Sequence, residues 1–180
     1  MKICVFCGSR MGRDQDLVQE TVELGRFFAR EGFELVYGGG KVGLMGKIAD
    51  GVLEGGGRVT GIIPTFLSTE EVARHDLTTL EMVQTMEERK RRMFEISDAF
   101  VTLPGGFGSL DELFEAVTLT QLRIHEKPNL IVSYRGYYDD LDRQLQRMET
   151  DGFMTSETRR LCEFLSDFGA LKAALLGLRS

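Results

Sequence analysis

Apolar residues along the chain follow two alternating patterns, short continuous runs and longer runs with helical spacing. The short runs are followed by glycine, proline or polar residues, and they cover Lys2 to Phe6, Phe33 to Tyr37, Arg58 to Ile63, the stretch from Val101, and Pro128 to Tyr134. Such runs are typical of strands buried on both faces. A further segment, Leu77 to Val83, is expected to be extended.

Between these runs, apolar residues recur at the spacing of amphipathic helices. The first helix is expected to begin at Asp14 or Asp16 and to end at Gly32. Others are expected over Leu44 to Leu53, Thr85 to Ser97, Ser109 to Leu122, Tyr138 to Met148, and Ala170 to Leu178. Strand and helix therefore alternate, which predicts an α/β fold: one Rossmann-like domain over residues 1–180, with a doubly wound parallel sheet and helices on both faces.

Glycine-rich turns follow three of the expected strands, at Gly8-Ser9, at Gly38-Gly39-Gly40 and at residues 105–108. In doubly wound sheets, ligands bind beyond the carboxyl ends of the strands, so these turns are expected to converge on one ligand. The second turn has the spacing G-x-G-x-x-G but does not follow the first strand, and no P-loop Gly-Lys-Ser/Thr is present. It is interpreted as an anion-facing or ribose-facing turn.

The third turn leads from an apolar run into a helix. Gly105, Gly106 and Gly108 permit close backbone approach, and a helix beginning near Ser109 would direct amide groups and a positive dipole end at an anion. The sequence Ser109-Leu-Asp-Glu112 also has the spacing of a capping box, and this is the preferred interpretation of these residues taken alone.

A second stretch, Met86 to Met93, favours a functional role for Glu112 over a capping role. Glu87 with Arg91 and Glu88 with Arg92 have the spacing of stabilising surface ion pairs. Another face of the same helix carries two cations without such acidic partners, between two apolar residues, and consists of Met86, Arg89, Lys90 and Met93. We expect this face to line a cleft, where its cations can meet both a phosphate and the carboxylate of Glu112.

Composition limits the class of partner. The formal net charge is −6, which argues against general binding to nucleic acid or to membrane surfaces. No apolar run approaches the roughly 20 residues of a membrane span, and a cytoplasmic location is expected. The three cysteines provide no second pair at zinc-ligand spacing besides Cys4-x-x-Cys7, and Cys4 and Cys7 are interpreted as buried thiols rather than a redox pair. No metal site is therefore expected.

Two long signatures carry a family resemblance. Residues 104–112 read Pro-Gly-Gly-Phe-Gly-Ser-Leu-Asp-Glu, and residues 86–90 read Met-Glu-Glu-Arg-Lys. They resemble Pro-Gly-Gly-x-Gly-Thr-x-x-Glu and Met-His-x-Arg-Lys of the LOG (Lonely Guy) family, the cytokinin riboside 5′-monophosphate phosphoribohydrolases. The early Cys-Val-Phe-Cys-Gly-Ser, the Tyr-Gly-Gly-Gly turn and the later Gln-Leu-x-x-His-x-Lys-Pro fit as well, so the resemblance spans nearly the whole chain.

The resemblance implies a hydrolase that releases free base and ribose 5-phosphate from a nucleoside 5′-monophosphate without a cofactor, and that is a dimer or a larger assembly. It implies Arg89 and Glu112 as the catalytic pair. Nucleotide contacts are implied for Glu71, Lys90, Gly106, Phe107, Gly108, Ser109, Leu110, Asp111 and Thr118. The glycine turns and the cleft-facing helix add Gly8, Ser9, Gly39, Gly40, Gly105 and Met86 as candidates.

Four positions depart from the family pattern. Ser109 replaces Thr and keeps the hydroxyl. Glu87 stands in place of His and Leu119 in place of Trp, and both changes bear on the base pocket or the dimer interface. Arg123 replaces Gly.

The expected chemistry follows from the charge that develops on the sugar. Cleavage of the C–N bond builds positive charge on the ribose, which Glu112 can stabilise while it orients a water. Arg89 is expected to keep Glu112 ionised; an arginine is a poor proton donor, so the donor to the base is left open. Two alternatives stay open: a non-catalytic nucleotide-binding or regulatory module, and a lysine decarboxylase, which needs a pyridoxal-binding lysine and site. The preferred base is open as well.

Overall fold

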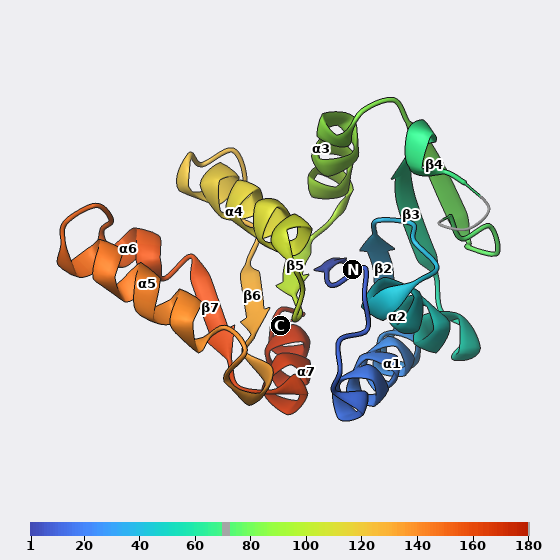
Figure 1. Ribbon diagram of the computed structural model, residues 1–180, viewed down its shortest axis with the longest axis horizontal. Helices are drawn as coiled ribbons and strands as arrows, with labels where there is room; N and C mark the ends of the chain where they lie inside the picture. Colours follow the sequence, from blue (N-terminus) through green and yellow to red (C-terminus); the bar gives the residue numbers. More distant parts are fainter. Residues whose placement is uncertain (70–72, 180) are drawn as a thin grey trace.

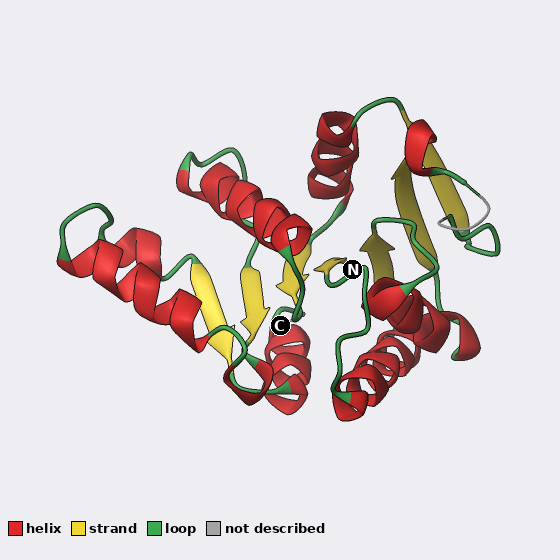
Figure 2. Ribbon diagram, viewed as in Figure 1, coloured by secondary structure: helices red, strands yellow, loops and turns green. Residues whose placement is uncertain are grey.

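The computed structural model describes residues 1–69 and 73–179, and its strands form a single sheet (Figures 1 and 2). The strands are β1 (Lys2–Phe6), β2 (Glu34–Tyr37), β3 (Val59–Pro64), β4 (Thr79–Val83), β5 (Ala99–Thr102), β6 (Asn129–Val132) and β7 (Cys162–Leu165). The helices are α1 (Gln15–Glu31), α2 (Gly43–Glu54), α3 (Met86–Ile96), α4 (Phe107–Gln121), α5 (Asp139–Thr150), α6 (Ser156–Arg159) and α7 (Phe168–Gly177). Two short 3-10 helices cover Thr65–Leu67 and Tyr134–Gly136.

Apolar side chains on both sides of the sheet explain why the strands read as continuous runs. In β1, Ile3 and Val5 join one buried cluster, which includes side chains of α1, α2 and α7. Cys4 and Phe6 point to the opposite face and pack with Met93 of α3 and residues of α4. A third cluster joins α4 and α5 to β6 and β7. Helices therefore cover both faces of the sheet, as the sequence predicts (Figure 1).

The strand order places the topological switch point at β1 and β5. All neighbouring pairs are parallel, in the order β4-β3-β2-β1-β5-β6-β7. The chain builds the sheet outward from β1 in one direction through β2 to β4, and in the other from β5 to β7. The carboxyl ends of β1 and β5 therefore open the crevice in which such sheets bind ligands.

Two elements of the C-terminal part were not predicted. Strand β7 lies at one edge of the sheet and has four residues, of which only Cys162 is buried, and α6 has a single turn. Helix α4 begins at Phe107, two residues before the predicted start at Ser109. Within the described residues, no helix has both the length and the apolar character needed to cross a bilayer.

Candidate active site

The three glycine turns meet around a cavity of about 390 Å³ at the switch point. The first turn contributes Ser9, the second Gly38 and Gly40, and the third Gly106 and Gly108. The remaining wall consists of Cys7, Met45, Ile63, Leu67, Arg89, Phe107, Ser109 and Glu112. The expectation that the turns converge is confirmed, and the cavity has the size of a small-molecule site.

Arg89 and Glu112 approach each other from α3 and α4. Arg89 Nη2 lies 3.6 Å from Glu112 Oε1, and each side chain is 11% exposed. The guanidinium is also held by β3, because Arg89 Nε donates a hydrogen bond of 3.2 Å to the carbonyl of Ile62. The carboxylate of Glu112 accepts no hydrogen bond from the described residues, so its oxygens are available to the cavity.

Burial dominates the ionisation of Glu112. Desolvation raises the pKa of Glu112 from 4.5 to about 7, although the positive charge of Arg89 acts in the opposite direction. The expectation that Arg89 keeps this carboxyl ionised is confirmed only in direction, because Arg89 lowers the pKa but the ion pair at 3.6 Å does not offset burial. A carboxyl group that titrates near neutral pH is suited to proton transfer.

The capping-box interpretation of Ser109 and Glu112 is also wrong. The N-cap of α4 is Gly106, no side chain caps this helix, and Ser109 and Glu112 lie inside it and are buried. The capping box occurs instead at α3, where Glu88 N donates to Thr85 Oγ1 and Gln84 N donates to the carboxylate of Glu88.

An uncapped N-terminus leaves the first amide groups of α4 available. Phe107, Gly108 and Ser109 occupy the first three positions, whose N–H groups have no partner within the helix, and no other described residue accepts from them. All three residues line the cavity. Such amides, together with the positive end of the helix dipole, favour an anion about one helical turn from Glu112.

Two tyrosine hydroxyl groups fix the backbone conformation of the third glycine turn. Tyr137 Oη donates a hydrogen bond of 2.7 Å to the carbonyl of Gly105, and Tyr138 Oη donates one of 2.9 Å to that of Leu103. Gly105 has to lack a side chain, because a Cβ there would lie 2.1 Å from Ser109 Oγ. These contacts hold the turn on both sides of Pro104.

The second turn contributes Gly38 and Gly40 to the cavity wall, and the helix that follows it bonds to the first turn. The amides of Leu44 and Met45, at the start of α2, donate to the carbonyl of Gly8, so these donors hold two turns together instead of facing an anion. Gly38, which we did not single out as a site residue, makes room for Arg89: a Cβ at Gly38 would lie 1.8 Å from Arg89 Nη2. In the sequence, only the run of three glycines at 38–40 indicated that this position needs space for another group.

The remaining charges of α3 join it to its neighbours. Lys90 Nζ lies 2.9 Å from Asp111 Oδ2 and 2.5 Å from Glu115 Oε2, both on α4. The predicted pairs within α3 are not formed among the described residues. Arg91 pairs with Glu95, and Arg92 pairs with Glu81 of β4 and with Glu95.

Several candidate residues lie outside the cavity wall. Lys90 and Asp111 are engaged with each other, and Met86 Sδ lies 3.8 Å from Arg89 Nη1. Thr118 is exposed and donates to the carbonyl of Phe114. Gly8, Gly39, Gly105 and Leu110 are adjacent to lining residues but are not part of the wall. Glu71 lies outside the described residues.

The cysteines are buried and free, as predicted. Burial raises the pKa of the Cys4 and Cys7 thiols well above their usual range, which makes both inert. Among the residues that the structure describes, no group of three or more His, Cys, Asp or Glu side chains is arranged to hold a metal ion.

Fold and site together define an α/β protein whose cavity at the switch point combines an uncapped helix N-terminus with a buried carboxylate and arginine. Residues 45–175 match the family described as possible lysine decarboxylase. The cytokinin riboside 5′-monophosphate phosphoribohydrolase of Rhodococcoides fascians is 39% identical over 179 residues, which cover 99% of this chain and 89% of that protein. The probable enzyme LOGL1 of Oryza sativa subsp. japonica is 42% identical over 160 residues, covering 89% and 72%. The chain therefore belongs to this family, the LOG family that the sequence signatures resemble.

Solved structures confirm the fold. The molybdenum cofactor binding protein of Rippkaea orientalis has a TM-score of 0.75 at 18% identity, covering 99% of this chain and 97% of that one. The molybdenum cofactor carrier protein of Chlamydomonas reinhardtii has a TM-score of 0.75 at 20% identity, with the same coverage. At this level of identity the similarity concerns the fold alone.

Proposed function

We propose that the chain is a phosphoribohydrolase that cleaves the N-glycosidic bond of a nucleoside 5′-monophosphate, either AMP or a cytokinin riboside 5′-monophosphate, and releases free base and ribose 5-phosphate. Its relatives carry this activity in their names. The observation that supports it most directly is the placement of the Arg89–Glu112 pair and the free amides of α4 in one cavity.

The anion site is assigned to the 5′-phosphate. The amides of Phe107, Gly108 and Ser109 bind its oxygens, and the helix dipole adds a favourable field. Binding there fixes the nucleotide at a group that does not react, so that the ribose is oriented over Glu112. The apolar wall formed by Met45, Ile63 and Leu67 is left for the rest of the nucleotide.

Glu112 is assigned the chemical step. As the C1′–N bond lengthens, its electron pair moves onto the base nitrogen and positive charge develops on the ribose, which the ionised carboxylate stabilises. The oxygen of a water adds to C1′ and its proton passes to Glu112, whose pKa of about 7 suits a general base. The departing base takes up one proton from solvent, and Glu112 returns the proton that it accepted to solvent, so that the carboxylate is restored. Arg89 orients the carboxylate.

The first experiment measures product release. Incubation with AMP and with isopentenyladenosine monophosphate should release free base, quantified by chromatography, and equimolar ribose 5-phosphate. Glu112→Gln should bind AMP with nearly unchanged affinity and lower kcat on the order of a hundredfold or more, because it removes a charge-stabilising group. Glu126→Gln, in an exposed loop, is the control and should retain wild-type turnover.

Each alternative predicts a different result. AMP binding without release of base by the wild-type protein would favour the non-catalytic module. A pyridoxal absorbance band with loss of CO₂ from lysine would favour the decarboxylase. Normal turnover by Glu112→Gln would leave the activity in place but remove Glu112 from the chemical step.

We also propose a cytoplasmic homodimer that acts on free nucleotides rather than on nucleic acid. The acidic composition and three free, buried thiols support the location and the class of partner. Cell fractionation tests the location. Apolar side chains exposed on α4 and just after it support a dimer, for which a test is given in the Discussion.

A further inference from the structure

Residues 73–76 form a strap across the second glycine turn. Ala73 pairs with Gly40 in an isolated antiparallel bridge, and the amide of Arg74 donates a hydrogen bond of 3.0 Å to the carbonyl of Gly39. The strap leads on to β4 at the edge of the sheet. The position of the turn is therefore coupled to that of the strap.

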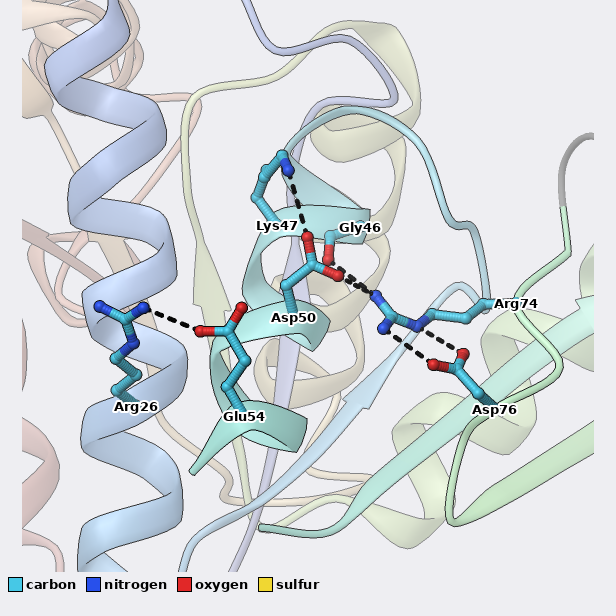
Figure 3. A network of polar contacts seen from close by, with 7 residues as sticks. All are labelled: Arg26, Gly46, Lys47, Asp50, Glu54, Arg74 and Asp76. Atoms are coloured by element: carbon cyan, nitrogen blue, oxygen red, sulfur yellow. Dashed lines mark hydrogen bonds and ion pairs between the residues drawn. The ribbon is translucent and has the colours of Figure 1, made fainter. Parts of the chain in front are cut away.

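The side chain of Arg74 ties this strap to α2 (Figure 3). Its Nε and Nη2 donate to the two carboxylate oxygens of Asp76, at 2.8 and 3.1 Å. Its Nη1 donates to the carbonyl of Gly46 at 3.2 Å and to the carboxylate of Asp50, both on α2. Only 14% of the Arg74 side chain is exposed, and its bonds to α2 are partly buried, whereas Asp76 lies on the solvent side with 67% of its side chain exposed. This arrangement needs a planar guanidinium, because its nitrogens donate at the same time to Asp76 and to α2.

The turn that Arg74 holds lies against the guanidinium of Arg89. The guanidinium of Arg89 occupies the space that a side chain at Gly38 would fill, directly before the residues to which the strap bonds. On its other sides this guanidinium contacts the carbonyl of Ile62 and the carboxylate of Glu112. A shift of the turn therefore moves one wall of the space in which Arg89 lies.

We propose that Arg74 is a positioning residue of the active site, which acts through the strap and the Gly38–Gly40 turn to hold Arg89 against Glu112. Arg74 itself does not line the cavity with Arg89 and Glu112. The inference rests on the proposed function for its kinetic consequence, whereas its geometric consequence can be measured without substrate.

The first readout is the ionisation of Glu112 in the substrate-free protein, followed by NMR of ¹³C-labelled glutamate side chains. The charges that act on this carboxyl are Arg89 and Lys90, which lower its pKa, and Asp111 and Glu115, which raise it. Of these, only Arg89 lies against the glycine turn. Arg74→Gln should therefore raise the pKa of Glu112 above the wild-type value. A substitution that merely lowers stability leaves that pKa unchanged in the folded protein.

The second readout is kinetic. Arg74→Gln should lower kcat about tenfold through misplacement of Arg89. The KM for AMP should change less than about threefold, because the phosphate is assigned to the amides of α4. Asp76→Asn should shift both values in the same direction, and it provides a second variant if Arg74→Gln does not fold.

Two further variants set the scale. Gly38→Ala introduces a methyl group that collides with the end of the Arg89 side chain, and it gives the pKa and kcat of a displaced guanidinium. Arg26→Gln removes the exposed ion pairs of Arg26 with Glu23 and with Glu54, and it should behave as wild type. Figure 3 shows the pair with Glu54 beside this network. A wild-type pKa of Glu112 and a wild-type kcat in folded Arg74→Gln and Asp76→Asn would overturn the inference and leave the proposed function intact. Failure of the wild-type protein to release base would instead refute the proposed function.

Discussion

The buried carboxyl of Glu112 makes the stability of the protein depend on pH at the scale of a single residue. Its pKa of about 7 in the folded protein exceeds 4.5, the value expected for the unfolded chain. Between these values the folded state binds more protons than the unfolded state, so this group lowers the free energy of unfolding as the pH rises. The loss of free energy of unfolding is complete once the pH exceeds the folded-state pKa of about 7, and it amounts to roughly 3 kcal/mol at most.

Glu112→Gln removes that cost, so the stability gained by the substitution should grow between pH 5 and pH 8. Urea unfolding at both pH values measures it. His125 has a lowered pKa and acts with the opposite sign in the same window, so the difference between the two proteins is more informative than either curve alone. Glu126→Gln should run parallel to wild type. A constant difference between Glu112→Gln and wild type would show that the carboxyl is not neutralised by burial.

Single residues also show how far the sequence can predict the site. Thr85-x-x-Glu88 and Ser109-x-x-Glu112 have the same spacing, yet only the first forms a capping box. The difference is where each helix begins, which depends on the glycine turn before α4 and on the packing of Ser109 against Gly105. Glu112 is buried because its helix lies over the sheet, and local sequence does not contain that information.

At the scale of elements, four helices end with the same backbone motif. After α1, α2 and α5, a glycine at positive φ is followed by a residue whose amide bonds back to the last turn; these glycines are Gly32, Gly56 and Gly152. After α4 the same two hydrogen bonds are formed by the amides of Arg123 and Ile124, to Thr120 and Leu119. Arg123 therefore has a φ of 57°, a left-handed conformation that disfavours a side chain.

Arg123→Gly should consequently stabilise the protein by about 1 kcal/mol, the approximate cost of a side chain in this conformation. Gly152→Ala, which has open space around its Cβ and a φ of 81°, should destabilise it by a similar amount. Chemical denaturation of both variants measures the two effects. If Arg123→Gly were destabilising, contacts of the arginine would outweigh its backbone strain.

The elements missed by the sequence are those that local patterning marks least. Strand β7 lies at the edge of the sheet and only Cys162 of its four residues is buried, so it lacks the continuous apolar run by which the inner strands were predicted. Strand β4, at the other edge, was predicted only as an extended piece. Edge strands bury one side and therefore have a weaker signal.

At the scale of the whole molecule, the sheet order was predictable as a class but not in detail. Alternating strands and helices imply a parallel sheet with right-handed connections, and hence a switch point. The order itself places the ends of β1 and β5 side by side, with Ile3 opposite Ala99, and this makes the turn after Phe6 and the turn after Thr102 two walls of one cavity. Pairing between strands almost 100 residues apart leaves no mark in local sequence.

The outer face of α4 bears on the size of the assembly. Phe114 and Thr118 lie one turn apart on its exposed side, and Leu122 and Ile124, which follow the helix, are 63% and 65% exposed. An exposed apolar strip next to charged α3 is typical of an interface.

We therefore expect the protein to have twice the chain mass of 20.2 kDa in solution, measured by light scattering after size-exclusion chromatography. Phe114→Asp should shift it toward the single-chain mass, because it introduces a charge where apolar contact is expected. Phe153→Asp, at a residue 87% exposed in the loop after α5, should leave the mass unchanged. A dimer that persists in Phe114→Asp would place the interface on another face, and a wild-type monomer would exclude the homodimer.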